Sequence, residues 1–151
     1  MDIDGKNNIC LTNSSYRKYD LKFLPKGDYV FFQSEQLSSP YVIYKSWLLN
    51  INTQQLTQLD NKNNNYTDFS ISPDQTKILY VGAKERSANE PIDIYVMNWN
   101  MDKSKKITNG GINYNPIFNN DGTKIVYRHM NDWNEKYEIR LKEDKNGNWG
   151  L

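Results

Sequence analysis

This sequence of 151 residues is short of the residue types from which most catalytic and metal-binding sites are built. Its one cysteine, Cys10, excludes an intrachain disulfide framework and a cysteine-rich zinc site. Its one histidine, His129, supports neither a metal site nor a catalytic triad by itself. Neither a Gly-x-Ser-x-Gly motif nor a glycine-rich phosphate loop occurs. The sequence therefore predicts a chain that is not an enzyme and holds no metal and no cofactor.

A charge excess and long apolar runs are missing too. The 19 basic and 18 acidic residues leave a net charge of +1 at pH 7. Nucleic acids and anionic membranes bind clustered Lys and Arg, so this balance argues for neither partner. No apolar run approaches the roughly 20 residues of a membrane span, and residues 1–20 lack the pattern of a signal peptide. We expect no nucleic-acid partner and no membrane span.

What the sequence does contain is an internal repeat. Residues 74–80 (DQTKILY) match residues 121–127 (DGTKIVY) at a spacing of 47. Residues 25–32 (PKGDYVFF) are a weaker copy, 48 residues before residues 73–80. A fixed period of this size indicates one structural unit that is repeated along the chain.

Each period has the pattern of four β-strands and shows no helical periodicity. In the middle copy, strands at 66–72, 77–81 and 92–99 precede a last strand that ends at Ile107-Thr108. Val, Ile, Tyr and Phe fill these strands, and Pro, Gly, Asn and Asp separate them. Four antiparallel strands per 40–50 residues are typical of a β-propeller blade. The sequence therefore predicts an all-β fold, a propeller segment of about three four-stranded antiparallel blades.

We expect these blades at about residues 14–59, 60–109 and 110–151, within a single partial propeller domain spanning 1–151. Residues 1–13 (MDIDGKNNICLTN) align with residues 97–109 and would form the outer hairpin of another blade. Residues 148–151 are a candidate fourth strand of the last blade. Closed propellers have 4–8 blades, so three cannot close a ring. Either a homodimer completes a six-bladed ring, or the chain is a piece of a longer protein.

A four-residue turn precedes the second strand of each copy. Its fourth position is Gly27 in the first copy and Gly122 in the third, and this position needs a positive φ. The middle copy has Gln75 there, which we expect to adopt the left-handed conformation at a cost of about 1 kcal/mol.

The segments SPDQTKILY at 72–80, DIYVMN at 93–98 and Ile107-Thr108 resemble the TolB-like (WD40-like) β-propeller repeat. The resemblance covers nearly the whole chain, with Gln75 in place of Gly and Asn119-Asn120 in place of Ser-Pro as departures. It implies a bacterial, non-catalytic scaffold that mediates protein–protein interaction, periplasmic or extracellular if the chain is a fragment of such a protein. The same repeat builds the propellers of prolyl-oligopeptidase-like and dipeptidyl-peptidase-like enzymes. A regulatory propeller of such an enzyme and a glycan-binding surface module are therefore the alternatives.

In a propeller, the loops between strands two and three and those between blades share one face. Here these loops are residues 34–40, 82–91, 129–136, 13–18, 60–66 and 109–114. Aromatic and Arg side chains are the usual interface contacts, and Trp133 is the aromatic residue that we most expect to be exposed. The predicted binding residues are Tyr16, Tyr66, Arg86, Tyr114, His129, Asp132 and Trp133.

Overall fold

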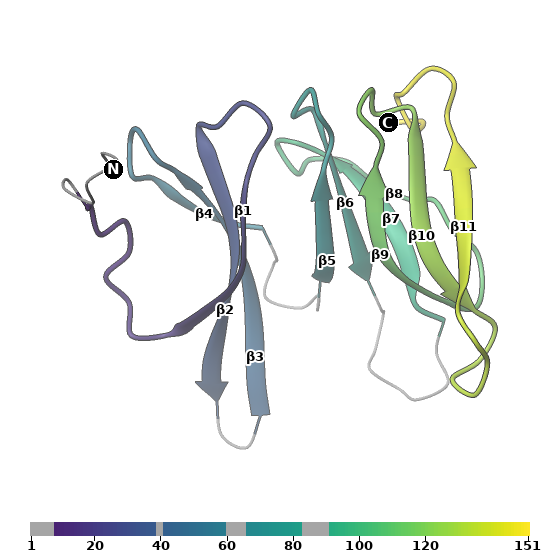
Figure 1. The fold of residues 1–151 in the computed structure, drawn as a ribbon, viewed down its shortest axis with the longest axis horizontal. Coiled ribbons are helices and arrows are strands. Elements are labelled where there is room, and N and C mark those ends of the chain that lie inside the picture. Colours follow the sequence, from purple (N-terminus) through teal and green to yellow (C-terminus); the bar gives the residue numbers. More distant parts are fainter. Residues whose placement is uncertain (1–7, 39–40, 60–65, 83–90) are drawn as a thin grey trace. The chain divides into compact units, whose positions relative to one another are not determined.

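The computed structural model describes residues 8–38, 41–59, 66–82 and 91–151 (Figure 1). The described residues form eleven strands in three antiparallel sheets, and they contain no helix. The all-β prediction is therefore confirmed. The chain divides into two compact units, residues 1–58 and residues 59–151, and each is considered by itself.

The first unit contains one four-stranded sheet. Its strands are β1 (Arg17–Phe23), β2 (Tyr29–Ser38), β3 (Tyr41–Asn50) and β4 (Leu56–Gln58), and they lie in this order. The expected loop at 34–40 is wrong over residues 34–38, because β2 continues to Ser38 in register with β3. The β-branched residues Val42 and Ile43 lie opposite the polar end of β2, and such residues favour strands.

The expected strand that ends at Leu11-Thr12 does not form. Residues 8–15 carry no strand, and residues 1–7 lie outside the described residues. A strand needs a hydrogen-bonding neighbour, and no described strand pairs with this segment. The segment instead lines a cleft on one face of the β1–β4 sheet, where Leu11 and Thr12 lie beside Trp47 and Leu49.

The second unit contains two sheets. One has the strand order β5-β6-β7-β8, and the other has the order β11-β10-β9. The strands are β5 (Tyr66–Ile71), β6 (Lys77–Gly82), β7 (Asp93–Asn98), β8 (Ser104–Lys106), β9 (Ile112–Phe118), β10 (Lys124–Met130) and β11 (Glu138–Glu143). Leu79, Ile94 and Val96 of the first of these sheets are fully buried in one apolar cluster with Ile125 and Trp149. This core joins the two sheets of the unit.

The expected fourth strand at 148–151 is wrong. Trp149 lies in a turn with φ 57° and buries its ring in the apolar cluster, where its Nε1–H donates to the Gly122 carbonyl at 3.0 Å. Asp144 fixes this turn, because its carbonyl accepts the Gly147 N–H at 2.9 Å and its carboxylate accepts the Trp149 N–H. An indole that finds both an apolar site and an acceptor is stabilised more than one in an exposed edge strand.

The repeated turn recurs in all three sheets. The residue at its fourth position has φ 76° at Gly27, 60° at Gln75 and 75° at Gly122, which confirms the left-handed conformation expected for Gln75. Its N–H donates to the carbonyl of the first turn residue at 2.8, 2.9 and 3.2 Å, respectively. The three copies thus share one backbone conformation although their sequences differ.

A second repeated feature lies in the first strand of each sheet. Asp20, Asp68 and Asn115 have φ of 52°, 51° and 49°, and each lies at a β-bulge. The Asp68 carboxylate accepts the backbone N–H of Asn115 at 3.1 Å. A second bond between the same strands runs from the Phe118 N–H to the Ser70 hydroxyl at 3.4 Å. These bonds connect β5 to β9 beside the apolar cluster.

Candidate functional site

The loop between β10 and β11, residues 131–137, presents the most prominent aromatic residue of the predicted set. Trp133 lies in this loop and is 54% exposed, as expected. Its ring packs against Tyr114 of β9, with 6.0 Å between the ring centroids and 54° between the ring planes. A large aromatic surface is therefore ordered at the surface of the second unit.

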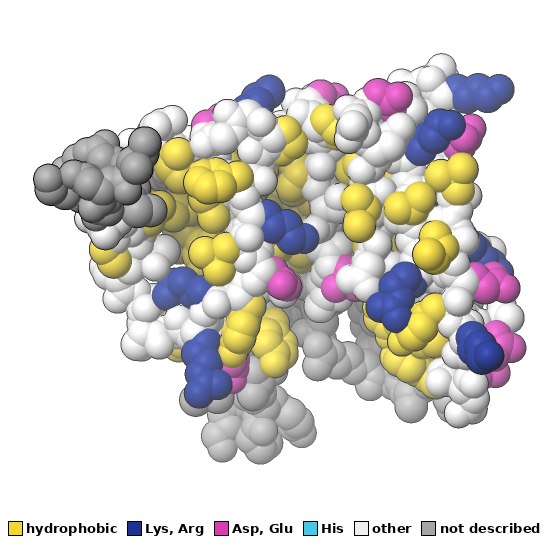
Figure 2. All heavy atoms as spheres, in the orientation of Figure 1, with side chains coloured by type: hydrophobic (Ala, Val, Ile, Leu, Met, Phe, Trp, Pro, Cys, Tyr) yellow, Lys and Arg dark blue, Asp and Glu magenta, His cyan; other side chains and the backbone are white. Residues whose placement is uncertain are grey.

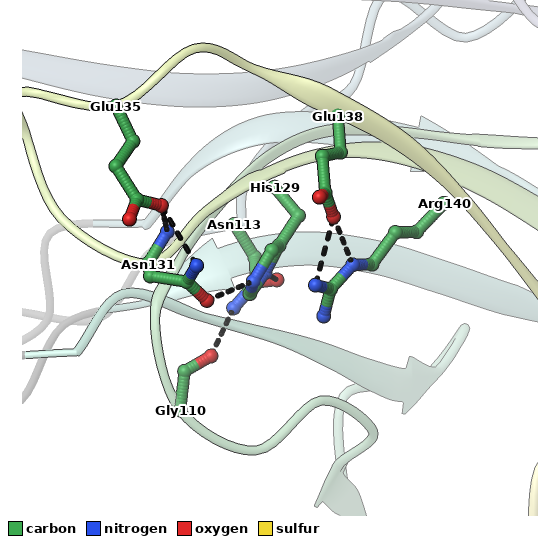
Figure 3. A network of polar contacts seen from close by, with 7 residues as sticks. All are labelled: Gly110, Asn113, His129, Asn131, Glu135, Glu138 and Arg140. Atoms are coloured by element: carbon green, nitrogen blue, oxygen red, sulfur yellow. Dashed lines mark hydrogen bonds and ion pairs between the residues drawn. The ribbon is translucent and has the colours of Figure 1, made fainter.

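Beneath this loop lies His129, which was expected in a loop and in contact with a partner. The loop position is wrong, because His129 belongs to β10 and is only 4% exposed, whereas its contact with a partner stays a prediction. Its Nδ1 lies 2.9 Å from Asn113 Oδ1, and its Nε2 lies 3.2 Å from Asn131 Oδ1. The polar ring is buried because both nitrogens have a hydrogen-bonding partner (Figure 3).

The two Asn side chains are themselves fixed by other contacts. The Asn113 amide donates to the carbonyl oxygens of Ile92 and Gly110 at 2.9 and 3.1 Å. The Asn131 amide donates to the Glu135 carboxylate at 2.7 Å. These bonds orient both amide oxygens toward the His129 ring, so the network connects the core of the unit to the loop (Figure 3).

The loop also carries its own hydrogen bonds. The Asp132 carboxylate accepts the Asn134 N–H at 2.7 Å, and its carbonyl accepts the Glu135 N–H at 3.3 Å. At the end of the loop, the Arg128 guanidinium lies 3.7 Å from the centroid of the Tyr137 ring. These contacts hold the backbone on either side of Trp133, as a preformed binding loop requires.

Tyr114 is half-buried beneath Trp133, and burial is the main cause that raises the pKa of its phenol. Nearby Tyr137 and Asp68 raise that pKa further. The phenol therefore stays neutral over the physiological range. It can take part in binding as an aromatic surface with one polar group.

The structure brings Tyr114, His129, Asp132 and Trp133 together, and it does not bring the other predicted residues to them. Tyr16 belongs to the other unit, where it is exposed beside the cleft of the β1–β4 sheet. Tyr66 begins β5, and its side chain is not described. Arg86 lies outside the described residues. Sequence reasoning missed Asn113, Asn131 and Glu135, because no motif marks two amides that converge on one histidine.

The described residues show no arrangement for metal chemistry. Among them, no group of three or more His, Cys, Asp or Glu side chains is placed to hold an ion. Within the same residues, no helix is long and apolar enough to cross a membrane.

Comparison with known proteins identifies the fold. No family model and no curated protein matches the sequence. Among solved structures, TolB from Acinetobacter baumannii is 16% identical, with a TM-score of 0.51 over 94% of this chain and 45% of that one. The β-propeller domain of the Trilobed protease from Pyrococcus furiosus is 19% identical, with a TM-score of 0.66 over 90% and 42% of the two chains.

An oligogalacturonate lyase, solved in complex with manganese, is 16% identical, with a TM-score of 0.62 over 95% of this chain and 40% of that one. The chain spans less than half the length of these three structures. They differ in activity and share the propeller, so they show the fold alone. With its three antiparallel sheets and its repeated turns, this chain has the TolB-like β-propeller fold.

Proposed function

We propose that this chain is a non-catalytic TolB-like scaffold that binds a protein partner through residues 131–137. The observation that carries this proposal is the position of Trp133. Its side chain is exposed and its ring packs against Tyr114. The loop around it is connected to the buried His129 by hydrogen bonds. Trp and Tyr are the residues most enriched among interface hot spots. A Trp that is already ordered loses little side-chain freedom on binding, so more of its contact energy remains as affinity.

The surroundings of Trp133 suit a protein partner. Asp132, Asn134 and Lys136 of the same loop are exposed, so the loop also presents polar side chains of both charges. An aromatic centre with a polar rim is the usual anatomy of a protein interface. Loops on a rigid β-scaffold are also where binding function is most often found.

The test is affinity capture from the source cells with the tagged full-length chain, its Trp133→Ala variant and its Met101→Ala variant. Met101 is exposed at the β7–β8 hairpin, so its substitution is a control of similar exposure away from the loop. We expect a partner that binds the wild type and the control. Trp133→Ala should weaken its binding at least about tenfold in titrations with the purified partner.

Retention of the same partner by the Trp133→Ala variant with unchanged affinity would contradict the proposal. Circular dichroism establishes that this variant is folded. The exposed position of Trp133 makes a large loss of stability unexpected.

A regulatory propeller of a peptidase is the second candidate, supported by the likeness to the propeller of the Trilobed protease. The two candidates differ in what the loop would bind. If the captured partner reacts with a fluorophosphonate probe, which labels serine hydrolases, the second candidate is favoured. Quenching of Trp133 fluorescence by soluble oligosaccharides, absent in the Trp133→Ala variant, would instead favour a glycan-binding module.

A further inference from the structure

The sheet β9–β11 has one face that no described residue of the second unit covers. Val126, Ile139 and Leu141 point to this face together with Ile117, and all four are exposed. Ile139 is 83% exposed. Figure 2 shows apolar side chains gathered over the part of the molecule that β9, β10 and β11 occupy. We call these four residues the outer face.

The repeat relates the outer face to positions that are buried in the sheet β5–β8. Val126 pairs with Leu141 across β10 and β11, just as Leu79 pairs with Val96 across β6 and β7. Leu79 and Val126 occupy the same position of the repeat, 47 residues apart. Leu79 and Val96 are fully buried, whereas their counterparts are exposed.

The next residue pair on this face, two residues further along each strand, also has a buried counterpart in the sheet β5–β8. Ile139 lies opposite Arg128 in the way that Ile94 lies opposite Val81. Ile94 is fully buried and Val81 is buried beside it, both in the apolar cluster of the second unit. Three buried apolar positions of one sheet are therefore exposed apolar positions of the next.

The burial of these positions in the sheet β5–β8 comes from the neighbouring sheet. Phe118, Ile125 and Tyr127 pack onto Leu79, Ile94 and Val96 in that cluster. A further sheet of the same repeat would cover the outer face in the same way, because stacked repeats bury equivalent faces against one another.

The chain itself carries a sheet with the matching face. Phe23 ends β1 and pairs with Val30, just as Phe118 ends β9 and pairs with Ile125. Phe118 is packed in the core, whereas Phe23 is 72% exposed. A cleft of about 410 Å³ opens on the same sheet, where Phe32, Trp47 and Leu49 line it together with residues 10–14 of the segment before β1. We call Phe23 and the residues of this cleft the receiving face.

The hydrogen bond between β5 and β9, the first strands of the two sheets, can also form at the outer face. Asp68 accepts the backbone N–H of Asn115, and Asn115 occupies the position of Asp68 in the next sheet. The Asn115 side-chain oxygen accepts from the Arg128 guanidinium at 3.4 Å, and its second lone pair can accept the N–H of an equivalent bulge residue. Asp20, at the bulge of β1, is that equivalent residue in the sheet β1–β4.

We propose that the outer face binds the receiving face of a second copy of this chain, in a head-to-tail contact made twice in a dimer. The described residues of each chain form three sheets, so two chains supply six, within the 4–8 blades of closed propellers. A head-to-tail contact that closes on itself yields a ring, which leaves no apolar face exposed. This surface is distinct from the loop around Trp133, so each proposal can fail without the other.

The experiment is sedimentation velocity of the purified full-length chain at micromolar concentration, with four variants. Ile139→Glu and Leu141→Lys place a charge on the outer face, and Phe23→Glu places one on the receiving face. Lys142→Glu is the control, because alternate residues of β11 point to opposite faces. We expect a dimer for the wild type and the control, and a folded monomer for the three other variants.

A wild-type monomer would overturn the proposal, as would a dimer that survives Ile139→Glu, Leu141→Lys and Phe23→Glu alike. Assemblies larger than a dimer would contradict the closed ring. The substituted side chains are exposed, so circular dichroism should show the wild-type spectrum for each variant.

Discussion

At the scale of the residue, the repeated turn explains why different sequences give the same backbone. In the middle copy, the Ser72 hydroxyl accepts the Lys77 N–H at 2.9 Å. In the third copy, Asn119 Oδ1 accepts the Lys124 N–H at the same distance of 2.9 Å. The departure from Ser-Pro therefore leaves the turn intact, because an Asn side chain provides the acceptor that Ser provides elsewhere.

Residues other than glycine in the left-handed conformation identify positions where glycine is expected to stabilise. Met101 has φ 61° in the β7–β8 hairpin, where its N–H donates to the Asn98 carbonyl at 2.8 Å and its side chain is exposed. Met101→Gly should raise the free energy of unfolding by about 0.5 kcal/mol, because it removes the steric strain and little packing. Gln75→Gly should raise the free energy of unfolding by less, because it also removes the contacts of a buried side chain.

Urea unfolding of both variants checks this prediction. A Met101→Gly variant that is less stable than the wild type would contradict the interpretation of this turn. A larger increase in the free energy of unfolding for Gln75→Gly than for Met101→Gly would show that the buried Gln75 side chain contributes nothing to stability.

The turn carboxylates predict a dependence of stability on pH. The Thr123 hydroxyl and backbone N–H donate to Asp121, and these bonds lower the pKa of its carboxyl below the ordinary value of 3.8. At Asp74, burial opposes ionisation, but hydrogen bonds from Ser72 and Thr76 outweigh it and lower the pKa. A lowered pKa in the folded state stabilises the protein above pH 3.8, and this contribution is lost as the pH falls through the folded value.

Asp121→Asn should therefore flatten the fall in melting temperature between neutral pH and about pH 3. The amide keeps an oxygen that can accept from Thr123, so the turn should persist. Melting curves at both pH values measure the difference directly. An unchanged pH profile in the variant would show that Asp121 does not contribute to the acid sensitivity.

At the scale of the element, the loop 131–137 depends on strands that precede it in the chain. Asn113 lies in β9, and its side chain connects His129 of β10 to the carbonyl groups of Ile92 and Gly110. The sequence predicted the loop and the exposure of Trp133, because both follow from local composition. It did not predict the network, because its members are brought together only by the pairing of β9 with β10.

Asn113→Ala should lower the free energy of unfolding by about 2 kcal/mol, because it leaves several buried polar groups without a partner. It should also increase amide hydrogen exchange in residues 131–137, since the loop is connected to the core through His129 and Asn131. Asn100→Ala, at an exposed hairpin position, is the matched control. Faster exchange in the variant with the control unchanged supports the network, whereas unchanged exchange would show that the loop is ordered without it.

At the scale of the whole molecule, the period of the repeat was enough to predict the fold class. The turns, the strand order and the antiparallel sheets recur with the spacing seen in the sequence. The ends of the chain were less predictable, and both predicted terminal strands are wrong within the described residues. Residues 8–15 have no strand to pair with, and Trp149 is stabilised more by burial than by a place at the sheet edge. The predicted single domain spanning 1–151 stays a prediction.

From the repeat we also expect the outer face around Ile139 to bind another sheet of the same kind, from a second copy of the chain. A crystal structure of the purified chain tests this most directly. We expect a ring of six sheets, in which β9–β11 of one copy packs against β1–β4 of another and Phe23 is buried. A structure in which Ile139 and Phe23 both face solvent would contradict it.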